Sequence, residues 1–234
     1  MTGSGSVEGT EAFPERPGGR RQLAKDERRS RIVRAARDLI RETGDTDLSM
    51  RMIAQRAEVS LATPYNLFGS KRAVVLAVFE DERDFAARFS RLQATNAIDR
   101  IFDAHDLAIG YYIDDPDFYR TLWKALLNTH GSDSTGLATH ERLDRNRAAW
   151  RLLLDTAESE GLLDGAVSSD VLERTLSCLS NGAMLAWAMD ALPTEALGAT
   201  TALGYALALR GTATPAGAEL LKPRIIRCQA LLAH

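Results

Sequence analysis

Basic side chains are concentrated near the start of the chain, where together they could bind an anion. Residues 20–34 contain only two acids, Asp26 and Glu27, against seven bases: Arg20, Arg21, Lys25, Arg28, Arg29, Arg31 and Arg34. Residues 1–91 carry a net charge of +3, from 17 basic and 14 acidic residues, whereas residues 92–234 carry −6, from 12 and 18. A basic front end on an acidic body predicts an anionic partner for one part of the molecule. The alternative is a solvated helix face with a charged lead-in.

Three stretches beside this cluster have the spacing of helices that could position it. The first has one apolar face, made by Ile32, Ala35, Ala36, Leu39 and Ile40, with Gly44 as its stop. Ser49 can cap a second, short helix, and Ser60 a third. Two short helices joined by a tight turn and braced by a longer one form a helix-turn-helix, whose second short helix can enter the major groove of DNA.

The rest of the sequence predicts an all-α protein. It shows no convincing period-2 alternation, and breaks rich in Pro, Gly, Ser and Asp divide it into about ten segments with helical periodicity. The predicted helices span 24–43, 49–56, 60–67, 70–92, 95–113, 116–129, 136–160, 169–190, 194–210 and 215–232. We expect a disordered N-terminal tail (1–19), a helix-turn-helix DNA-binding domain (20–72) and a larger helical ligand-binding and dimerisation domain (73–234).

Three motifs lie between Arg31 and Val78. They are Ile32-x-x-Ala35-Ala36-x-x-Leu39-Ile40-x-x-x-Gly44, Leu48-Ser49-Met50-Arg51-x-Ile53-Ala54, and Ala57-x-Val59-Ser60-x-Ala62-Thr63-x-Tyr65-x-x-Phe68-x-Ser70-Lys71. This stretch closely resembles the DNA-binding domain of the TetR family of transcriptional regulators. The segment from Thr63 to Lys71 is the most specific part of the resemblance, which covers about a fifth of the sequence.

The resemblance implies a DNA-binding role for ten positions. Ser49, Tyr65 and Lys71 would bind phosphates, for which hydroxyl and cationic donors are suited. Arg51 would meet base edges, since arginine is the usual bidentate partner of guanine. The third helix would present its exposed face to the bases through Leu61, Thr63, Pro64 and Asn66. Arg28 and Arg29 would reach an adjacent groove or its phosphates.

Two residues depart from the usual pattern of this motif. Glu58 stands in the turn where family members often carry glycine, and a positive φ there would cost it up to about 1 kcal/mol. Pro64 lies in the third helix and removes one backbone donor. If Ser60 is the cap, Pro64 is the fourth helical residue and one hydrogen bond is lost.

Polar and aromatic residues interrupt the apolar faces of the later helices. An apolar cavity with a few polar groups is the usual composition of a small-molecule site. The candidate ligand-binding residues are His105, Tyr112, Trp123, Asn128, Asn146, Trp150, Asn181 and Trp187. The alternatives are a satisfied core histidine, an asparagine that ends a helix, and tryptophans that serve packing alone. The resemblance implies that an effector enters this domain and changes the spacing of two DNA-binding heads.

A stripe of mostly small residues follows in the segment 194–210. It contains Gly198, Ala202, Tyr205, Ala206 and Leu209. An apolar stripe beyond what the core needs predicts a subunit interface, which together with part of 169–190 would make a four-helix dimer contact. The alternative is that the stripe faces the core of its own chain.

The sequence lacks the usual signatures of catalysis, secretion and membrane insertion. It contains no phosphate-binding loop, no HExxH and no Cys/His metal cluster, and its two cysteines, Cys178 and Cys228, form no CxxC pair. No apolar run is long enough to span a membrane, and the N-terminus does not resemble a signal peptide. We therefore expect a cytoplasmic protein that is not an enzyme and uses neither a cofactor nor a metal.

These observations predict a transcriptional regulator that responds to a ligand. We expect a homodimeric repressor whose partners are double-stranded DNA, at a near-palindromic operator, and a small-molecule effector. The alternative is a helical small-molecule-binding protein or enzyme with a non-functional DNA-binding motif. Duplex affinity at low salt distinguishes the two.

Overall fold

The computed structural model describes the backbone of residues 17–44, 48–81, 88–89, 91, 93–128 and 140–233. It describes the side chains of these residues except 17–20, 80–81, 125–128 and 140–146. The described part of the chain contains ten helices and no strand, and its one extended contact is an isolated bridge between Leu163 and Ala213. The predicted all-α fold is confirmed. No helix within these ranges is long and apolar enough to cross a membrane.

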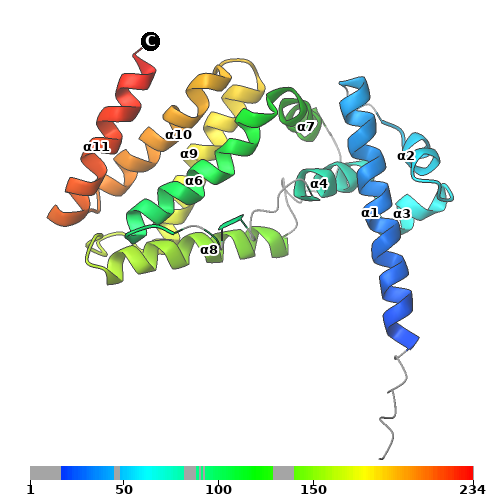
Figure 1. Ribbon diagram of the computed structural model, residues 1–234, viewed down its shortest axis with the longest axis horizontal. Helices are drawn as coiled ribbons and strands as arrows, with labels where there is room; N and C mark the ends of the chain where they lie inside the picture. Colours follow the sequence, from blue (N-terminus) through cyan, green and yellow to red (C-terminus); the bar gives the residue numbers. More distant parts are fainter. Residues whose placement is uncertain are drawn as a thin grey trace, which may run out of the picture.

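Four helices form the head of the molecule (Figure 1). They are α1 (Pro17–Thr43), α2 (Met50–Arg56), α3 (Ala62–Phe68) and α4 (Lys71–Asp81). Helices α2 and α3 lie along the side of α1 that faces away from the rest of the molecule, whereas α4 leads toward it. The apolar face predicted for the first helix is buried, and Ile32, Ala36 and Ile40 share one core with Ile53 of α2 and Val74 of α4. This core fixes α2 and α3 on α1.

Six helices form the body. They are α6 (Ala97–Asp114), α7 (Pro116–Asn128), α8 (His140–Ser159), α9 (Ser169–Ala188), α10 (Thr194–Arg210) and α11 (Pro215–Leu232). Helix α7 lies at the end of the body that faces the head, and α11 lies at the opposite end, packed against α10 (Figure 1). Helices α6, α8, α9 and α10 enclose most of the interior between these two ends.

The predicted helix positions agree with the structure, with three differences at helix ends. Helix α1 begins at Pro17, seven residues before the predicted start, so residues 17–19 of the predicted disordered tail are helical. Proline suits a first helical turn because that turn needs no N–H donor. The rest of the tail lies outside the described residues. The predicted helix 70–92 is described as α4 only to Asp81, and the third helix begins at Ala62 instead of residue 60.

One hydrophobic core continues from the head into the body. Val78 and Phe79 of α4 pack in the same cluster as Tyr112 of α6, Leu122 of α7 and Trp187 of α9. A second cluster lies wholly within the body, between α6, α8, α9, α10 and α11. Helix α4 therefore packs against both the head and the body within one continuous core.

Two loops at the far end of the body are joined by backbone hydrogen bonds. Thr214 N donates to Leu162 O at 3.1 Å, and Asp164 N donates to Thr212 O at 2.9 Å. Gly217, in the first turn of α11, lies so close to this junction that a Cβ on it would be 2.0 Å from Leu162 O. Only glycine therefore fits at residue 217 without moving the α8–α9 loop.

Candidate functional site

The turn between α2 and α3 has the geometry of a helix-turn-helix. Ser49 caps α2 as predicted, because its Oγ accepts a hydrogen bond from Met52 N at 3.1 Å. Helix α2 ends at Arg56 with Ala57 as its C-cap, and Val59 N donates back to Ala54 O at 3.0 Å. Glu58, between Ala57 and Val59, has a φ of 54°, in the left-handed region that glycine adopts most easily. The turn therefore requires the positive φ that the sequence suggested for this position.

The start of α3 corrects the prediction that Ser60 is its cap. The N-cap residue is Leu61, which has no side-chain capping bond, while Ser60 Oγ and Thr63 Oγ1 share a hydrogen bond of 2.8 Å. With Ala62 as the first helical residue, Pro64 is the third. Its missing N–H belongs to the first turn, where no intrahelical acceptor exists, so proline costs no helical hydrogen bond.

Only some of the α3 residues that were predicted to be exposed lie on the surface. Leu61 and Tyr65 are 52% and 51% exposed, and Asn66 is exposed as well. Thr63 is half-buried, and Pro64 is buried against the head. The prediction that Pro64 faces base edges is therefore wrong, because the proline ring packs inward. The remaining exposed face is an apolar and polar ridge centred on Tyr65.

The start of α4 lies next to this ridge. Gly69 ends α3 with a φ of 78°, and its N–H donates to Tyr65 O at 2.8 Å. Ser70 then caps α4, accepting a hydrogen bond from Ala73 N at 3.2 Å. Lys71 is the first residue of α4 and is half-buried. Its ammonium group adds positive charge at the N-terminus of a helix, where backbone N–H groups favour an anion.

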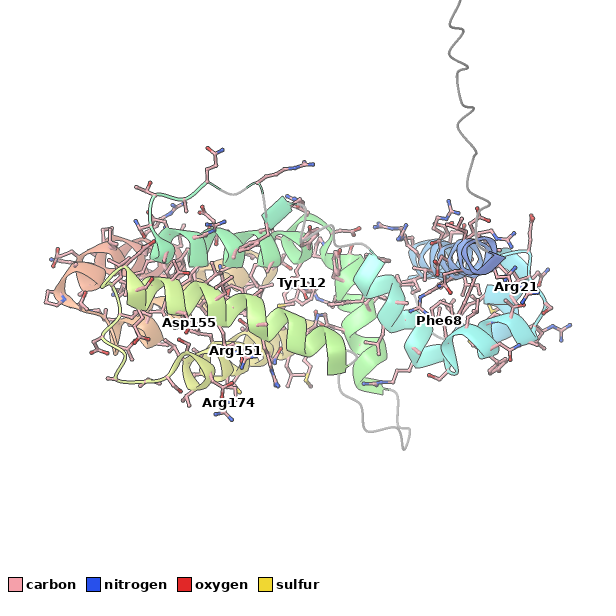
Figure 2. All side chains as sticks on the ribbon, turned by 90° about the horizontal axis from the view of Figure 1, so that it is seen from below. Arg21, Phe68, Tyr112, Arg151, Asp155 and Arg174 are labelled. Carbon is pink, nitrogen blue, oxygen red and sulfur yellow. The ribbon has the colours of Figure 1, made fainter. Side chains whose placement is uncertain are left out.

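The basic residues of the head have different roles. Arg28 and Arg51 are exposed and, among the described residues, form no hydrogen bond or ion pair. Arg29 instead braces α3: its Nη1 donates to Leu67 O at 3.3 Å, and its guanidinium lies 4.3 Å from the centre of the Phe68 ring. Figure 2 shows Phe68 in the head near α1. Arg28 and Arg51 are therefore the predicted arginines available to a ligand.

The predicted ligand-binding residues do not form a single group. Tyr112, Trp123 and Trp187 are buried in the first core, His105 is buried between α6 and α10, and Trp150 is half-buried on α8. Asn181 is exposed on α9, so its predicted place on an inward face is wrong. The side chains of Asn128 and Asn146 lie outside the described residues. Tyr112 lies inside the body in Figure 2.

Two of these buried polar groups are satisfied within the chain. His105 Nε2 lies 2.8 Å from Thr201 Oγ1, and His105 Nδ1 lies 2.9 Å from Asp106 Oδ1. Trp187 Nε1 donates to Thr194 Oγ1 at 3.0 Å. These contacts agree with the alternative interpretation of both residues as core groups with partners inside the protein.

The buried polar atoms without a hydrogen-bond partner in the described part of the chain include Trp123 Nε1, on α7, and Glu173 Oε2, on α9. Glu173 is only 2% exposed; its Oε1 accepts a bond from Ser177 Oγ at 2.7 Å, and its Oε2 lies 3.9 Å from Arg147 Nε, at the limit of an ion pair. A buried acceptor without a donor costs free energy, so it marks a place where a ligand can supply one.

Sequence reasoning missed Glu173, although a signal was present. The carboxylate lies between Leu172 and Leu176, on the face of α9 that those two leucines bury. It also faces Tyr205 closely enough to affect it electrostatically: burial raises the pKa of the Tyr205 hydroxyl, and the negative charge of Glu173 raises it further. Ser180 Oγ donates to that hydroxyl at 2.9 Å and opposes these effects.

The predicted interface stripe is directed into its own chain. Ala202, Tyr205, Ala206 and Leu209 belong to the second core. Gly198 packs beside Ile113, whose Cδ1 would lie 3.4 Å from an added Cβ. The stripe therefore has no surface left for a second subunit, and the alternative interpretation of it as core is the one the structure supports. The exposed large apolar residues of α9 and α10 are Val171, Leu179, Leu185, Met189 and Leu207.

The head and the body contact each other through aromatic rings. The Phe79 ring of α4 lies 6.1 Å from Tyr112, 6.0 Å from Tyr119 and 6.4 Å from Trp123, measured between ring centres. Trp123, which has the unpartnered indole N–H, is therefore in the same cluster as the helix that starts at Lys71. This cluster joins α4 of the head to α6 and α7 of the body through packed rings.

Together these features define a helix-turn-helix protein with an all-helical second part. Residues 32–78 match the family described as bacterial regulatory proteins, tetR family. Comparison with curated protein sequences gives no significant match. The sequence motif and the fold agree: residues 32–78 carry the DNA-binding domain of the TetR family, and the chain shares the all-helical fold of solved TetR family regulators.

Solved structures of regulators share the whole fold. TylP, a TetR regulator from Streptomyces fradiae, is 20% identical, with a TM-score of 0.56 over 90% of this chain and 93% of that one. FadR from Thermus thermophilus, a TetR family repressor solved with lauroyl-CoA, is 25% identical, with a TM-score of 0.61 over 78% and 94%. An ArpA-like γ-butyrolactone receptor is 16% identical, with a TM-score of 0.51 over 89% and 98%.

Proposed function

We propose that the protein is a homodimeric repressor that binds a near-palindromic operator through α3 and releases it when an effector binds in the body. The observation that carries this proposal is the exposed ridge of α3, where Leu61 and Tyr65 project from a helix held rigidly by α1, α2 and α4. An exposed ridge of this kind suits a major groove. We divide the chain into a DNA-binding part (20–72) and a ligand-binding and dimerisation part (73–234), with α4 packed against both.

The contacts with DNA are assigned by position and chemistry. Tyr65, Ser49 and Lys71 bind phosphates of the operator, and they set the register of the head on the duplex. Arg51, exposed on α2, and the α3 residues Leu61, Thr63 and Asn66 read base edges. Arg28, on the exposed side of α1, reaches phosphates beyond the groove. Arg29 acts by holding α3 through Leu67 and Phe68.

The dimer contact is assigned to the outer faces of α9 and α10. Val171, Leu185 and Met189 are exposed along α9 at intervals of whole helical turns, and Leu179 of α9 contacts Gly204 of α10. Leu207 of α10 is 55% exposed. Antiparallel α9 and α10 with their counterparts in a second copy would cover this apolar surface in a four-helix contact. A two-fold axis there presents two α3 helices to one duplex.

The effector site is assigned to the interior of the body near Trp123. Glu173 Oε2, beside Leu172 and Leu176 of the second core, is a separate candidate contact. A ligand that accepts a hydrogen bond from Trp123 Nε1 satisfies that unpartnered atom. At Trp123 it also lies in the aromatic cluster with Phe79 of α4. A shift of α4 changes the position of Lys71 and α3, and a dimer with altered head spacing loses operator affinity. The ligands of the similar structures, lauroyl-CoA and γ-butyrolactones, are the first probes for a thermal-shift test.

Selection of bound duplexes from a random pool tests the proposal as a whole. The expected result is enrichment of one near-palindromic sequence whose half-sites are about one helical turn apart. A protein that enriches no sequence, and shows no duplex affinity at low salt, would instead be the ligand-binding protein with a vestigial motif. Enrichment of a single, asymmetric half-site would remove the dimer from the proposal while leaving the DNA-binding surface in place.

The dimer assignment has its own test. A double substitution, Leu179→Glu with Leu207→Glu, places charges on the exposed face of α9 and α10 and should give monomers by sedimentation. Leu152→Glu, on the 67%-exposed position of α8, is the matched control and should leave the association state unchanged. A double variant that remains dimeric would move the interface elsewhere on the body.

A further inference from the structure

A second small pocket lies outside the DNA-binding face and the proposed effector site. It is a cavity of about 130 Å³ between α6, α10 and α11, at the end of the body farthest from the head (Figure 1). Its apolar wall is formed by Phe102, Ala199, Ala202 and Leu231. A cavity of about this size accommodates a molecule as large as benzene, which is well below a drug-sized ligand.

The charged side chains around this pocket differ in whether they already have partners within the protein. Arg224 is held in place, since its Nη2 donates to Asp99 Oδ1 at 2.7 Å and its guanidinium lies 4.4 Å from the centre of the Phe102 ring. Asp106 Oδ1 is 2.9 Å from His105 Nδ1. Arg227 lines the pocket, is exposed and forms no hydrogen bond or ion pair with any described residue. Arg227 is therefore the charged group of this pocket that is available to a ligand.

The acid of this pocket, Asp106, contacts a histidine instead of an arginine. His105 is itself held by Thr201, since its Nε2 lies 2.8 Å from Thr201 Oγ1. Asp106 forms no ion pair with Arg227 or Arg224, although all three residues line the same pocket. The pocket therefore offers an apolar wall and an unpaired guanidinium, the two features that recognise a small organic acid.

We propose that this pocket binds a small organic carboxylate, with its charged group on Arg227 and its apolar part against Phe102 and Leu231. The site is independent of the repressor function proposed above, because none of its residues belongs to α3, α4 or the Trp123 cluster. Benzoate has the required combination of an apolar body and one carboxylate. Benzamide has the same shape without the charge and serves as the matched comparison.

Cys228 provides a reporter inside the pocket. The thiol lines the cavity and is buried. Burial and the charge of Asp106 raise the pKa of Cys228, whereas the positive charges of Arg227 and Arg224 lower it, so the thiol senses the same groups as a ligand would. The other cysteine of the chain is Cys178, which is exposed on α9. A Cys178→Ser background leaves Cys228 as the sole thiol.

The experiment measures alkylation of Cys228 in full-length Cys178→Ser protein by iodoacetamide, in which the sulfur displaces iodide and the thiol proton passes to solvent. Benzoate should slow this reaction, with half-protection at a concentration about threefold to fivefold lower than that of benzamide, the scale of one exposed ion pair. The rate of alkylation by iodoacetate divided by the rate with iodoacetamide should be about threefold higher for Cys228 than for glutathione, because Arg227 attracts the carboxylate of iodoacetate. Arg227→Gln should abolish both differences, and Asp106→Asn should enlarge them.

Several results would overturn the proposal. Equal protection by benzoate and benzamide would show that Arg227 does not recognise the carboxylate. No protection by either compound, or a thiol that neither iodoacetamide nor iodoacetate alkylates, would show that the cavity admits no ligand of this size. A benzoate preference that survives Arg227→Gln would place the anion elsewhere. Arg174→Gln, on the exposed surface of α9 (Figure 2), is the matched control and should change none of these values.

Discussion

Arg41 of α1 and Asp115 at the junction of α6 and α7 form an ion pair in which Arg41 Nη1 lies 2.5 Å from Asp115 Oδ2. The same guanidinium lies 4.1 Å from the centre of the Phe118 ring of α7. One side chain of the head thus holds the body by a charge contact and a stacking contact at once. Together with the Phe79 cluster, it joins the head to α7 of the body.

Asp115→Asn and Arg41→Gln should separate these two contacts. Both carboxylate and guanidinium are partly exposed, so a double-mutant cycle in urea should give a coupling energy of about 0.2–1 kcal/mol. Arg41→Gln should destabilise more than Asp115→Asn, because it also removes the cation–π contact with Phe118, worth about 0.5–1 kcal/mol. Equal losses for the two single variants would mean that the stacking contributes nothing.

Glu58→Gly should stabilise the head. The left-handed conformation costs a residue with a Cβ roughly 1–2 kcal/mol, and glycine offsets part of that gain by its larger loss of entropy. At a φ of 54° the net gain should be about 0.5–1 kcal/mol, measured as a higher urea midpoint. Gln55→Gly, three residues earlier inside α2, is the control, and its free energy of unfolding should fall by a similar amount. A loss in both variants would argue against strain at Glu58.

Gly217→Ala should destabilise the body, because its Cβ would lie 2.0 Å from the backbone oxygen of Leu162. Relief requires a shift of the loop that Thr214 and Asp164 hold, at a cost of about 1–3 kcal/mol. Gly110→Ala in α6 is the matched control: its Cβ would meet nothing within 4 Å, so it should stabilise by about 0.5–1 kcal/mol. Thermal unfolding measures both, and a neutral Gly217→Ala would refute the close approach.

The contact between Glu42 and Arg56 should make stability depend on pH. Arg56 donates hydrogen bonds of 2.7 and 2.6 Å to the carboxylate, and these bonds hold the pKa of Glu42 below its ordinary 4.5. A lowered folded pKa stabilises the protein above about pH 4.5, and this contribution disappears as the pH falls through the folded value.

Urea midpoints of the wild type and Glu42→Gln, compared at neutral pH and near pH 3, measure this contribution. The wild type should have the higher urea midpoint at neutral pH. The difference in midpoint should decrease at low pH and in high salt, since both side chains are exposed. Glu219→Gln, on the surface of α11, should show no such trend. A difference in urea midpoint that stays constant with pH would contradict the assignment of the effect to Glu42.

The sequence predicted those features that local patterns determine. The face of Ile32, Ala36 and Ile40, the cap at Ser49 and the strained turn at Glu58 each follow from a few neighbouring residues, and the structure has all three. Pro64 was misjudged because α3 has only seven residues, too few for an apolar repeat to show which of its faces packs inward. Each residue turns the helix by about 100°, so the inward face is fixed by contacts with α1, α2 and α4.

The features that sequence could not predict depend on contacts between distant elements. Gly198 and Ala206 are spaced like an interface, but small residues also let α10 approach α6 and α9 inside one chain, and nothing local distinguishes the two. His105 was a candidate for ligand binding until Thr201, 96 residues away, was seen to satisfy it. Glu173 was overlooked because only the packing of α9 shows that its carboxylate is enclosed.

The central claim is that the exposed ridge of α3 binds DNA, and Leu61→Asp tests it most directly. Leu61 is 52% exposed at the start of α3, where a negative side chain interacts favourably with the helix N-terminus, so the helix keeps its stability while the ridge gains a negative charge. The measurement is duplex affinity by fluorescence anisotropy, with Leu152→Asp on α8 as control. We expect at least a tenfold loss of affinity for Leu61→Asp at unchanged melting temperature and none for the control; equal affinities of Leu61→Asp and the wild type would show that this ridge does not bind DNA.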